Sequence, residues 1–151
     1  MKIALPVLLL LAVFSGAERA VAGTIQQAES VVWQVAHYLQ AFGPEKTFAA
    51  INDRGGPFNS TDVYVFIHDR TGLIRAHGGF PSYIGTNIIW AKDLDGKEFV
   101  REIVSIRTSG IVTYKWLNPQ TREIQPKTTF VLSVDDLLIC AGVYDPVIIS
   151  E

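Results

Sequence analysis

The chain has 151 residues, the length of one ordinary domain, and 48% of them are apolar against 19% that are charged. This composition is typical of a globular protein and excludes a disordered, collagen-like or coiled-coil chain. The formal net charge of −2 argues against a nucleic-acid binder, which normally carries a basic excess. The single cysteine excludes an intrachain disulfide framework and a cysteine-based zinc site.

The first 22 residues have the features of a secretory signal peptide. Lys2 gives a positive start, residues 3–14 are almost entirely apolar, and residues 20–22 (AVA) have the small-x-small pattern of a cleavage site. The apolar run is shorter than the roughly 20 residues that a membrane-spanning helix needs. We therefore expect residues 1–22 to be removed, leaving residues 23–151 as one periplasmic or secreted domain without a transmembrane helix. A retained membrane anchor is the alternative.

A long helix is predicted at the start of the mature chain. Residues 24–42 carry apolar side chains at helical spacing on one face, namely Ile25, Ala28, Val31, Val32, Val35, Ala36 and Leu39. Gly43 and Pro44 should end this helix, because glycine suits a C-terminal cap and proline cannot continue the helix. Pro44 also suits the first position of a second, short helix that reaches about Asp53.

A β-hairpin and a long loop follow. Residues 63–68 are rich in β-branched and aromatic side chains, which predicts a strand. Residues 69–72 (DRTG) predict a tight turn, after which residues 73–77 return as the second strand. Residues 78–94 then read as one long loop, whose apolar and aromatic side chains argue against disorder. A loop of this length in a small domain indicates a functional role.

One more helix and three strands complete the predicted fold. Asp95, with Glu98 at capping-box spacing, predicts a helix that Gly110 ends. The remaining strands, which short joints connect, are predicted at residues 111–117, 123–134 and 137–144. The fold class is therefore α+β: a five-stranded antiparallel sheet with the long N-terminal helix on one face. A loop and short helices on the other face would cover a pocket.

Seven blocks in this order carry a resemblance to a known family: YVFIHD at 64–69, AHG at 76–78, IGTN at 84–87, KDLDGKEFV at 92–100, YKWLNP at 114–119, PK at 126–127 and AGVY at 141–144. Together they resemble the single Cache domain of the second type. The resemblance implies a PAS-like fold and an extracytoplasmic sensor that binds small molecules, often organic carboxylates. It implies neither enzymatic activity nor a cofactor.

Relatives of this kind usually lie between two transmembrane helices of a chemoreceptor, histidine kinase or cyclase. This chain ends about seven residues after its last predicted strand. We therefore expect a stand-alone exported module. Its expected partners are a small-molecule ligand, most simply a carboxylate, and a membrane receptor or transporter component, with no role for nucleic acid.

Lys127 is the candidate anchor for an anionic ligand. A carboxylate needs a cationic partner in a partly desolvated site, where their attraction exceeds its value in water. The alternative is a strand lysine that points into solvent, which is the common fate of lysine. Arg75 is a second candidate anchor, because strand alternation would put it on one face with His77.

Five further side chains are candidates for the pocket. Tyr114 and Trp116 alternate along one strand and would form an aromatic wall, although core packing is a common role for such pairs. Tyr64, His77 and Tyr83 would supply hydrogen bonds; each could instead pack, and His77 could lie at the surface. The predicted ligand-binding set is therefore Tyr64, His77, Tyr83, Tyr114, Trp116 and Lys127.

The sequence shows no combination of acid, base and nucleophile, so we expect no enzyme. The three histidines are too scattered to indicate a metal site, and Cys140 lies in an apolar strand that predicts a buried thiol. Two functions remain: a ligand-binding sensor, or a Cache-like interaction protein without a pocket that serves a membrane partner. An intact set of polar side chains inside the cavity would favour the first, and an apolar, collapsed cavity would favour the second.

We predict that export removes residues 1–22. Mass spectrometry of the protein from its native host should give a mature chain that starts at Gly23. A mass that still includes residues 1–22 would instead favour a retained anchor.

Overall fold

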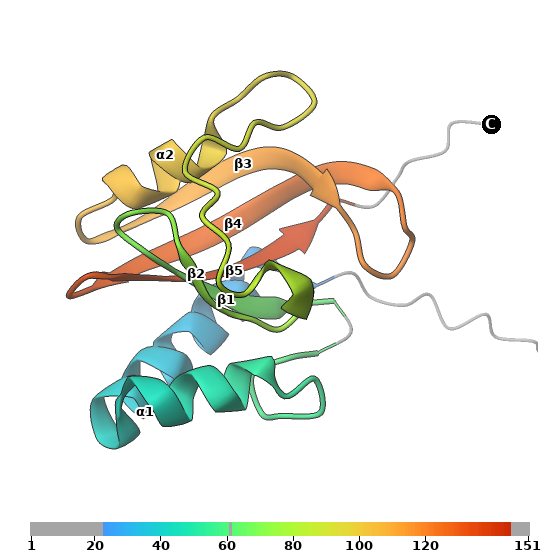
Figure 1. Ribbon diagram of the computed structural model, residues 1–151. Coiled ribbons are helices and arrows are strands. Elements are labelled where there is room, and N and C mark those ends of the chain that lie inside the picture. Colours follow the sequence, from blue (N-terminus) through green and yellow to red (C-terminus); the bar gives the residue numbers. More distant parts are fainter. Residues whose placement is uncertain (1–22, 61, 146–151) are drawn as a thin grey trace, which may run out of the picture.

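The computed structural model describes residues 23–60 and 62–145, so the predicted signal peptide lies outside the described residues. The elements in chain order are α1 (Ile25–Asn52), β1 (Tyr64–Asp69), β2 (Ile74–His77), the 3-10 helix η1 (Pro81–Tyr83), α2 (Phe99–Ser105), β3 (Ser109–Leu117), β4 (Ile124–Val134) and β5 (Leu137–Tyr144). Figure 1 shows α1 on one side of the sheet and α2 on the other.

Helix α1 begins and bends at the residues that the sequence indicates. Thr24 caps it: its hydroxyl accepts a hydrogen bond from the Gln27 amide, and the Gln27 side chain accepts one from the Thr24 amide. At Gly43 the backbone leaves the helical conformation, with φ at 79°. This left-handed conformation favours glycine, and Pro44 then starts the second arm of the helix.

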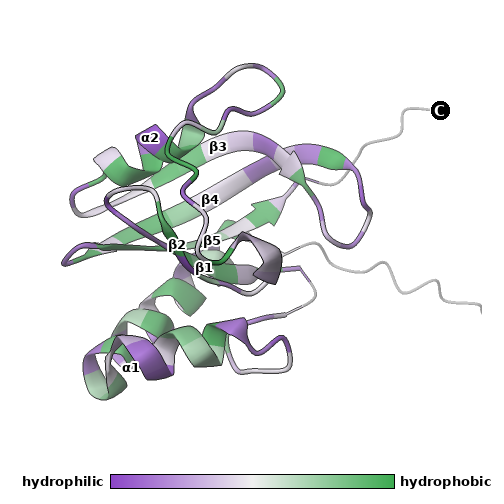
Figure 2. Cartoon of the chain, viewed as in Figure 1, coloured by the Kyte–Doolittle hydropathy of each residue, from purple (hydrophilic) through white to green (hydrophobic). Residues whose placement is uncertain are grey.

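The five strands form one antiparallel sheet, as predicted. Their order in the sheet is β2-β1-β5-β4-β3. Helix α1 covers one face and packs mainly against β5 and β4. The core on this face includes Val32 and Val35 of the helix and Val65, Ile67, Ile139 and Ala141 of the sheet. In Figure 2 the central strands are largely hydrophobic, whereas the turn between β3 and β4 is mostly hydrophilic.

The other face carries a second core, which α2 and residues 78–98 cover. Phe99, Val100 and Ile103 of α2 pack here against the sheet. Residues 78–98, here named the covering segment, run from the end of β2 across this face to the start of α2 (Figure 1). Aromatic and polar side chains of the sheet lie beneath them, so this face contains the candidate site.

The predicted cap of the third helix is wrong. Helix α2 starts at Phe99 and has no side-chain cap, and Gly110 belongs to β3. The reason is Asp93, whose Oδ1 accepts hydrogen bonds from the amides of Asp95 and Lys97 at 2.9 Å each. Together with Gly96, whose φ is 81°, this aspartate turn takes the place of the first predicted helical turn.

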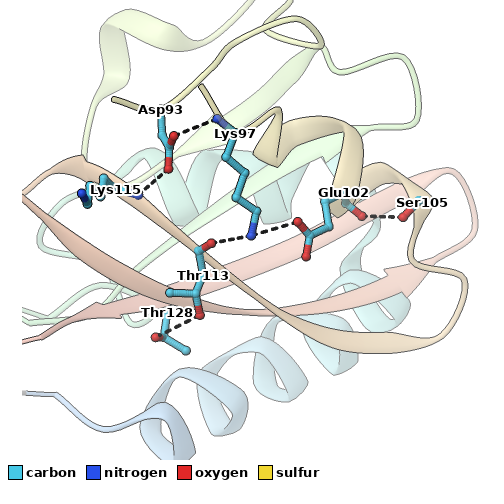
Figure 3. A network of polar contacts seen from close by, with 7 residues as sticks. All are labelled: Asp93, Lys97, Glu102, Ser105, Thr113, Lys115 and Thr128. Carbon is cyan, nitrogen blue, oxygen red and sulfur yellow. Dashed lines mark hydrogen bonds and ion pairs between the residues drawn. The ribbon is translucent and has the colours of Figure 1, made fainter. Parts of the chain in front are cut away.

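The covering segment is fastened to both edges of the sheet. At the β2 edge, the Ile74 amide donates to the Thr86 carbonyl, and the Gly85 amide donates to the Ile74 carbonyl, each at 2.9 Å. At the β3 edge, Asp93 Oδ2 accepts from the Lys115 amide at 3.0 Å (Figure 3).

Lys97 adds a second bond at the β3 edge. Its Nζ donates to the Thr113 carbonyl at 2.6 Å and pairs with Glu102 at 2.9 Å (Figure 3). These bonds to Thr113 and Lys115 satisfy backbone groups of an edge strand that would otherwise face solvent.

Asp93→Ala should lower the free energy of unfolding by about 1–2 kcal/mol, because one carboxylate holds three backbone amides. Urea denaturation measures this change. Asp95→Ala in the same turn is the matched control, since it removes only an exposed ion pair with Lys115 and should change stability little. Equal losses in the two variants would contradict the assigned role of Asp93.

Candidate functional site

Lys127 lies inside the protein rather than in solvent. It is 1% exposed, and its backbone lies opposite Tyr114 of β3 and Tyr144 of β5. The side chain crosses β5 and reaches β1, where Nζ donates a hydrogen bond to the Tyr64 hydroxyl at 2.6 Å. The alternative of a solvent-facing strand lysine is therefore wrong.

Gly142 of β5 makes this path possible. It lies between Lys127 and Tyr64 in the sheet, opposite Tyr64 on β1. A Cβ atom at this position would lie 2.6 Å from Cε of Lys127, closer than carbon atoms can approach. The glycine therefore leaves the space through which the lysine stem passes.

Aromatic rings surround the Lys127 ammonium. The distances from Nζ to the ring centroids are 4.0 Å for Tyr64, 4.7 Å for Phe66, 5.2 Å for Tyr144 and 5.9 Å for Tyr114. Cation–π attraction therefore replaces part of the lost hydration. No carboxylate pairs with Lys127 within residues 23–60 and 62–145. Burial accordingly lowers the pKa of Lys127 to about 7.

The hydroxyl groups beside Lys127 form a directional chain. The Tyr144 hydroxyl donates to the Leu117 carbonyl at 2.8 Å and lies 2.8 Å from the Tyr64 hydroxyl. Because Tyr144 uses its hydrogen on Leu117, Tyr64 donates to Tyr144 and accepts from Lys127. Burial raises the pKa of both phenols, so both stay neutral. This chain of hydrogen bonds uses one of the three N–H donors of the Lys127 ammonium.

His77 is a neutral donor in the same layer. Its Nδ1 accepts hydrogen bonds from the amides of Gly79 at 3.2 Å and Phe80 at 2.9 Å, which places the ring proton on Nε2. Burial, and then the nearby Lys127 charge, hold the pKa of His77 well below its usual value. The imidazole stacks on Tyr64 with ring centroids 5.3 Å apart.

Tyr83 and Trp116 close the outer side of the cluster. The Tyr83 ring, from the covering segment, lies 5.8 Å from His77 and 6.2 Å from Trp116. Trp116 lies 6.3 Å from Tyr114, which stacks on Phe99 of α2 at 4.1 Å. The structure thus brings the six predicted residues together in a closed ring of neighbours: Tyr64, His77, Tyr83, Trp116, Tyr114 and Lys127.

Arg75 lies apart from this ring. It was expected on one face with His77, but the pairing of β1 with β2 shifts between Ile67 and His68 and leaves Arg75 without an opposite residue. This bulge breaks the alternation. The Arg75 guanidinium lies over Phe48 of α1 at 5.4 Å and 3.7 Å from Asp69, on the other side of the sheet from Lys127.

Sequence reasoning missed three residues of this layer. Phe66 and Tyr144 contact the Lys127 ammonium, and His68 lies on the same face of β1 with its ring 5.4 Å from Phe66. His68 Nδ1 is buried without a hydrogen-bond partner in the described residues, and burial lowers the pKa of His68 to about 4. The two-residue turn 135–136 could have identified Tyr144, because counting back from it pairs Tyr144 with Lys127.

The described residues also bear on metal and membrane binding. Within them, no three His, Cys, Asp or Glu side chains gather in a way that would hold a metal ion. None of the described helices combines the length and apolar character needed to cross a membrane. Cys140 is buried, as its apolar strand predicts, and burial raises the pKa of its thiol.

Lys127→Met should stabilise the ligand-free domain by a few kcal/mol below pH 7, because one pKa unit corresponds to about 1.4 kcal/mol. The lysine pKa is about 7 in the fold against its usual 10.5. The unfolded chain therefore binds more protons between these values, and the stability of the parent rises with pH across this window. The increase in the free energy of unfolding that Lys127→Met causes should therefore become smaller as the pH rises from 7 to 10.5.

Urea denaturation at pH 6 and pH 9.5, in buffers without carboxylates, measures this difference. The other titratable groups are common to both proteins and cancel in the comparison. Parallel stability profiles for parent and variant would contradict a depressed lysine pKa.

Comparisons with known proteins identify the family and the fold of the chain. A family model described as single Cache domain 2 matches residues 23–146. Sensor histidine kinase MctS of Rhizobium johnstonii is 31% identical over 87 residues, which are 55% of this chain and 19% of that protein. The match thus spans only about a fifth of the length of this curated relative.

Three solved structures share the fold. A methyl-accepting chemotaxis protein from Vibrio parahaemolyticus has a TM-score of 0.68 and 19% identity, covering 80% of this chain and 87% of that one. A periplasmic sensor domain of a chemotaxis protein has a TM-score of 0.64 and 20% identity, covering 81% and 90%. A Cache chemosensory domain whose structure describes carboxylic acid recognition has a TM-score of 0.64 and 23% identity, covering 81% and 88%. Because the family model matches most of the chain, the chain belongs to the single Cache domain 2 family. Members of this family are extracytoplasmic sensor domains with a PAS-like fold.

Proposed function

We propose that this sensor domain binds a small organic carboxylate between the sheet and the covering segment. The observation that carries the proposal is the burial of the Lys127 ammonium without a carboxylate partner in the described part of the chain. A buried cation of this kind is costly to the free protein, and a bound anion would offset that cost.

The neighbouring groups suit the two ends of a small acid. Two N–H donors of Lys127 and Nε2–H of His77 would bind carboxylate oxygens. The neutral phenol of Tyr64 would orient the lysine, while Tyr114 and Trp116 would contact the apolar part of the ligand. Because Lys127 is 1% exposed, the site favours acids of a few carbon atoms over long chains.

The alternative, an interaction protein without a pocket, would be expected to have an apolar interior at this face. Lys127, His77 and Thr129 are instead buried there, and the Thr129 hydroxyl donates to Tyr114. These polar side chains support ligand binding. One structural neighbour is a Cache domain whose structure describes carboxylic acid recognition, which also supports a carboxylate.

Signalling through a membrane protein is the proposed use of the bound state. The relatives are a sensor histidine kinase and chemotaxis proteins, which supports a receptor as the partner. The Tyr64–Tyr144 contact links the lysine to the last residue of β5, so a ligand that moved Tyr64 would act on the end of that strand.

Lys127→Met should weaken carboxylate binding by about a hundredfold, because removal of one partner of a buried charge pair costs a few kcal/mol. Isothermal titration with acetate, propionate and pyruvate measures this, after a thermal-shift screen that includes amino acids. Arg75→Ala is the control and should bind like the parent, since its guanidinium lies on the other face.

A pH series gives a second measure of the same anchor. The groups facing Lys127 keep one charge state from pH 7 to 9, because burial raises the pKa of three and lowers that of two: Tyr64, Tyr144, Cys140, His68 and His77. Lys127 alone among them titrates there, so affinity should fall about tenfold per pH unit above about 7.

Two results would overturn the assignment. If Arg75→Ala loses binding and Lys127→Met does not, the anchor is wrong. If neither variant matters, the ligand is not an anion and the interaction protein without a pocket becomes the better proposal.

A further inference from the structure

A cleft lined by both polar and apolar residues opens beside the Lys127 site. It has a volume of about 510 Å³ and lies between three segments that are distant in the sequence: the loop after α1, the start of the covering segment, and the turn between β3 and β4. Its lining includes Arg54, Tyr64, Gly79, Leu117 and Arg122, and we name it the arginine cleft. Figure 1 shows these three segments at the same end of the sheet.

Tyr64 belongs to both the cleft and the site. Its side chain lines the arginine cleft, while its hydroxyl accepts the hydrogen bond from Lys127 at 2.6 Å. Gly79 lies flat on the Tyr64 ring, because a Cβ there would be 2.9 Å from the ring atoms. The Tyr64 side chain is therefore the partition between the solvent-filled cleft and the buried ammonium.

The charge of the cleft differs from that of the whole chain. Among the residues that the structure describes, two arginines line it and no Asp or Glu does, although the chain has a formal net charge of −2. Arg54 donates to the Gly79 carbonyl at 3.0 Å, which ties one wall of the cleft to the covering segment. Asp62, which is not part of the lining, accepts a hydrogen bond from Gln120. The lining thus presents an electropositive surface beside Tyr64.

Arg122 is held in an unfavourable backbone conformation. Its φ is 64°, in the left-handed region that glycine and asparagine tolerate best. Its amide donates to the Asn118 carbonyl at 2.9 Å and so closes the turn between β3 and β4. A glycine would satisfy this turn with less strain, so the turn gives no reason for an arginine. Such strain points to a role of the side chain.

We propose that the arginine cleft is an anion-binding vestibule that captures the carboxylate and delivers it past Tyr64 to Lys127. This inference rests on the proposed function of Lys127. Arg54 and Arg122 attract the anion from solvent, and displacement of the Tyr64 side chain opens the way to the ammonium. Charges at the rim of a site act mainly on the association rate and its salt dependence, and little on dissociation.

Stopped-flow tryptophan fluorescence with propionate as the probe tests the delivery step. Arg122→Gln and the double variant with Arg54→Gln should associate about three- to tenfold more slowly at low salt, with unchanged dissociation. The difference should disappear near 0.5 M salt, where screening is strong. Arg107→Gln is the matched control, because Arg107 is exposed and outside the cleft.

Arg122→Gly separates the effect of the Arg122 charge on association from any effect of this residue on folding stability. This variant removes the strained left-handed arginine, so its melting temperature should equal or exceed that of the parent while association still slows. Arg122→Lys should restore the rate. A parent-like association rate at low salt in Arg122→Gln and in the double variant would overturn the proposal.

A second measurement examines the cleft without Lys127. In Lys127→Met, propionate should still shift the amide NMR signals of Gly79 and Gln120, and Arg122→Gln should abolish these shifts. If neither the parent nor Lys127→Met shows them, the cleft binds no anion and the inference fails. If the parent shows them but propionate does not bind at Lys127, the proposed function and the delivery role fail, and anion binding in the cleft stands alone.

Discussion

A lysine ammonium kept out of water, with no carboxylate beside it in the described part of the chain, determines most of the architecture on one face of the sheet. Gly142 has no side chain, so the lysine stem can cross β5. Aromatic rings from β1, β3 and β5 surround Nζ, and Tyr64 and Tyr144 link it to the Leu117 carbonyl through neutral hydroxyls. The free domain is therefore less stable than an apolar core would make it, and a bound anion would offset this loss of stability.

The covering segment holds this face closed by using both edges of the sheet. Gly85 and Thr86 bond to β2, while Asp93 and Lys97 bond to β3, so the segment spans the sheet above the lysine. Tyr83 projects from it onto His77, and α2 continues the cover with Phe99. A ligand beneath the segment would contact groups joined to both edge strands. Occupancy of a small site can in this way alter the whole sheet.

Local chemistry predicted most elements, because the helix stripe, the Gly43 break and the short turns act within a few residues. The wrong predictions lie where another side chain competes for the same backbone amides, or where a strand is irregular. Asp93 took the backbone amides that a cap at Asp95 was expected to organise, and one bulge reversed the face of Arg75. Side-chain chemistry and strand alternation indicated the six candidates, but spacing alone cannot show that Lys127 crosses β5 and that the six form a ring. Contacts between β1 and the other strands, such as that of Phe66 with Lys127, depend on strand order and have no local signal.

The double fastening of the covering segment also bears on self-association. An open sheet normally presents two rows of unpaired amides and carbonyls, which another copy can use to extend the sheet or to begin a fibril. Here the Ile74 amide and carbonyl are occupied at one end of the sheet, as are the Lys115 amide and the Thr113 carbonyl at the other. Strand addition at these positions would first have to break the bonds that close the site. Resistance to edge-to-edge aggregation and closure over Lys127 therefore rely on the same hydrogen bonds.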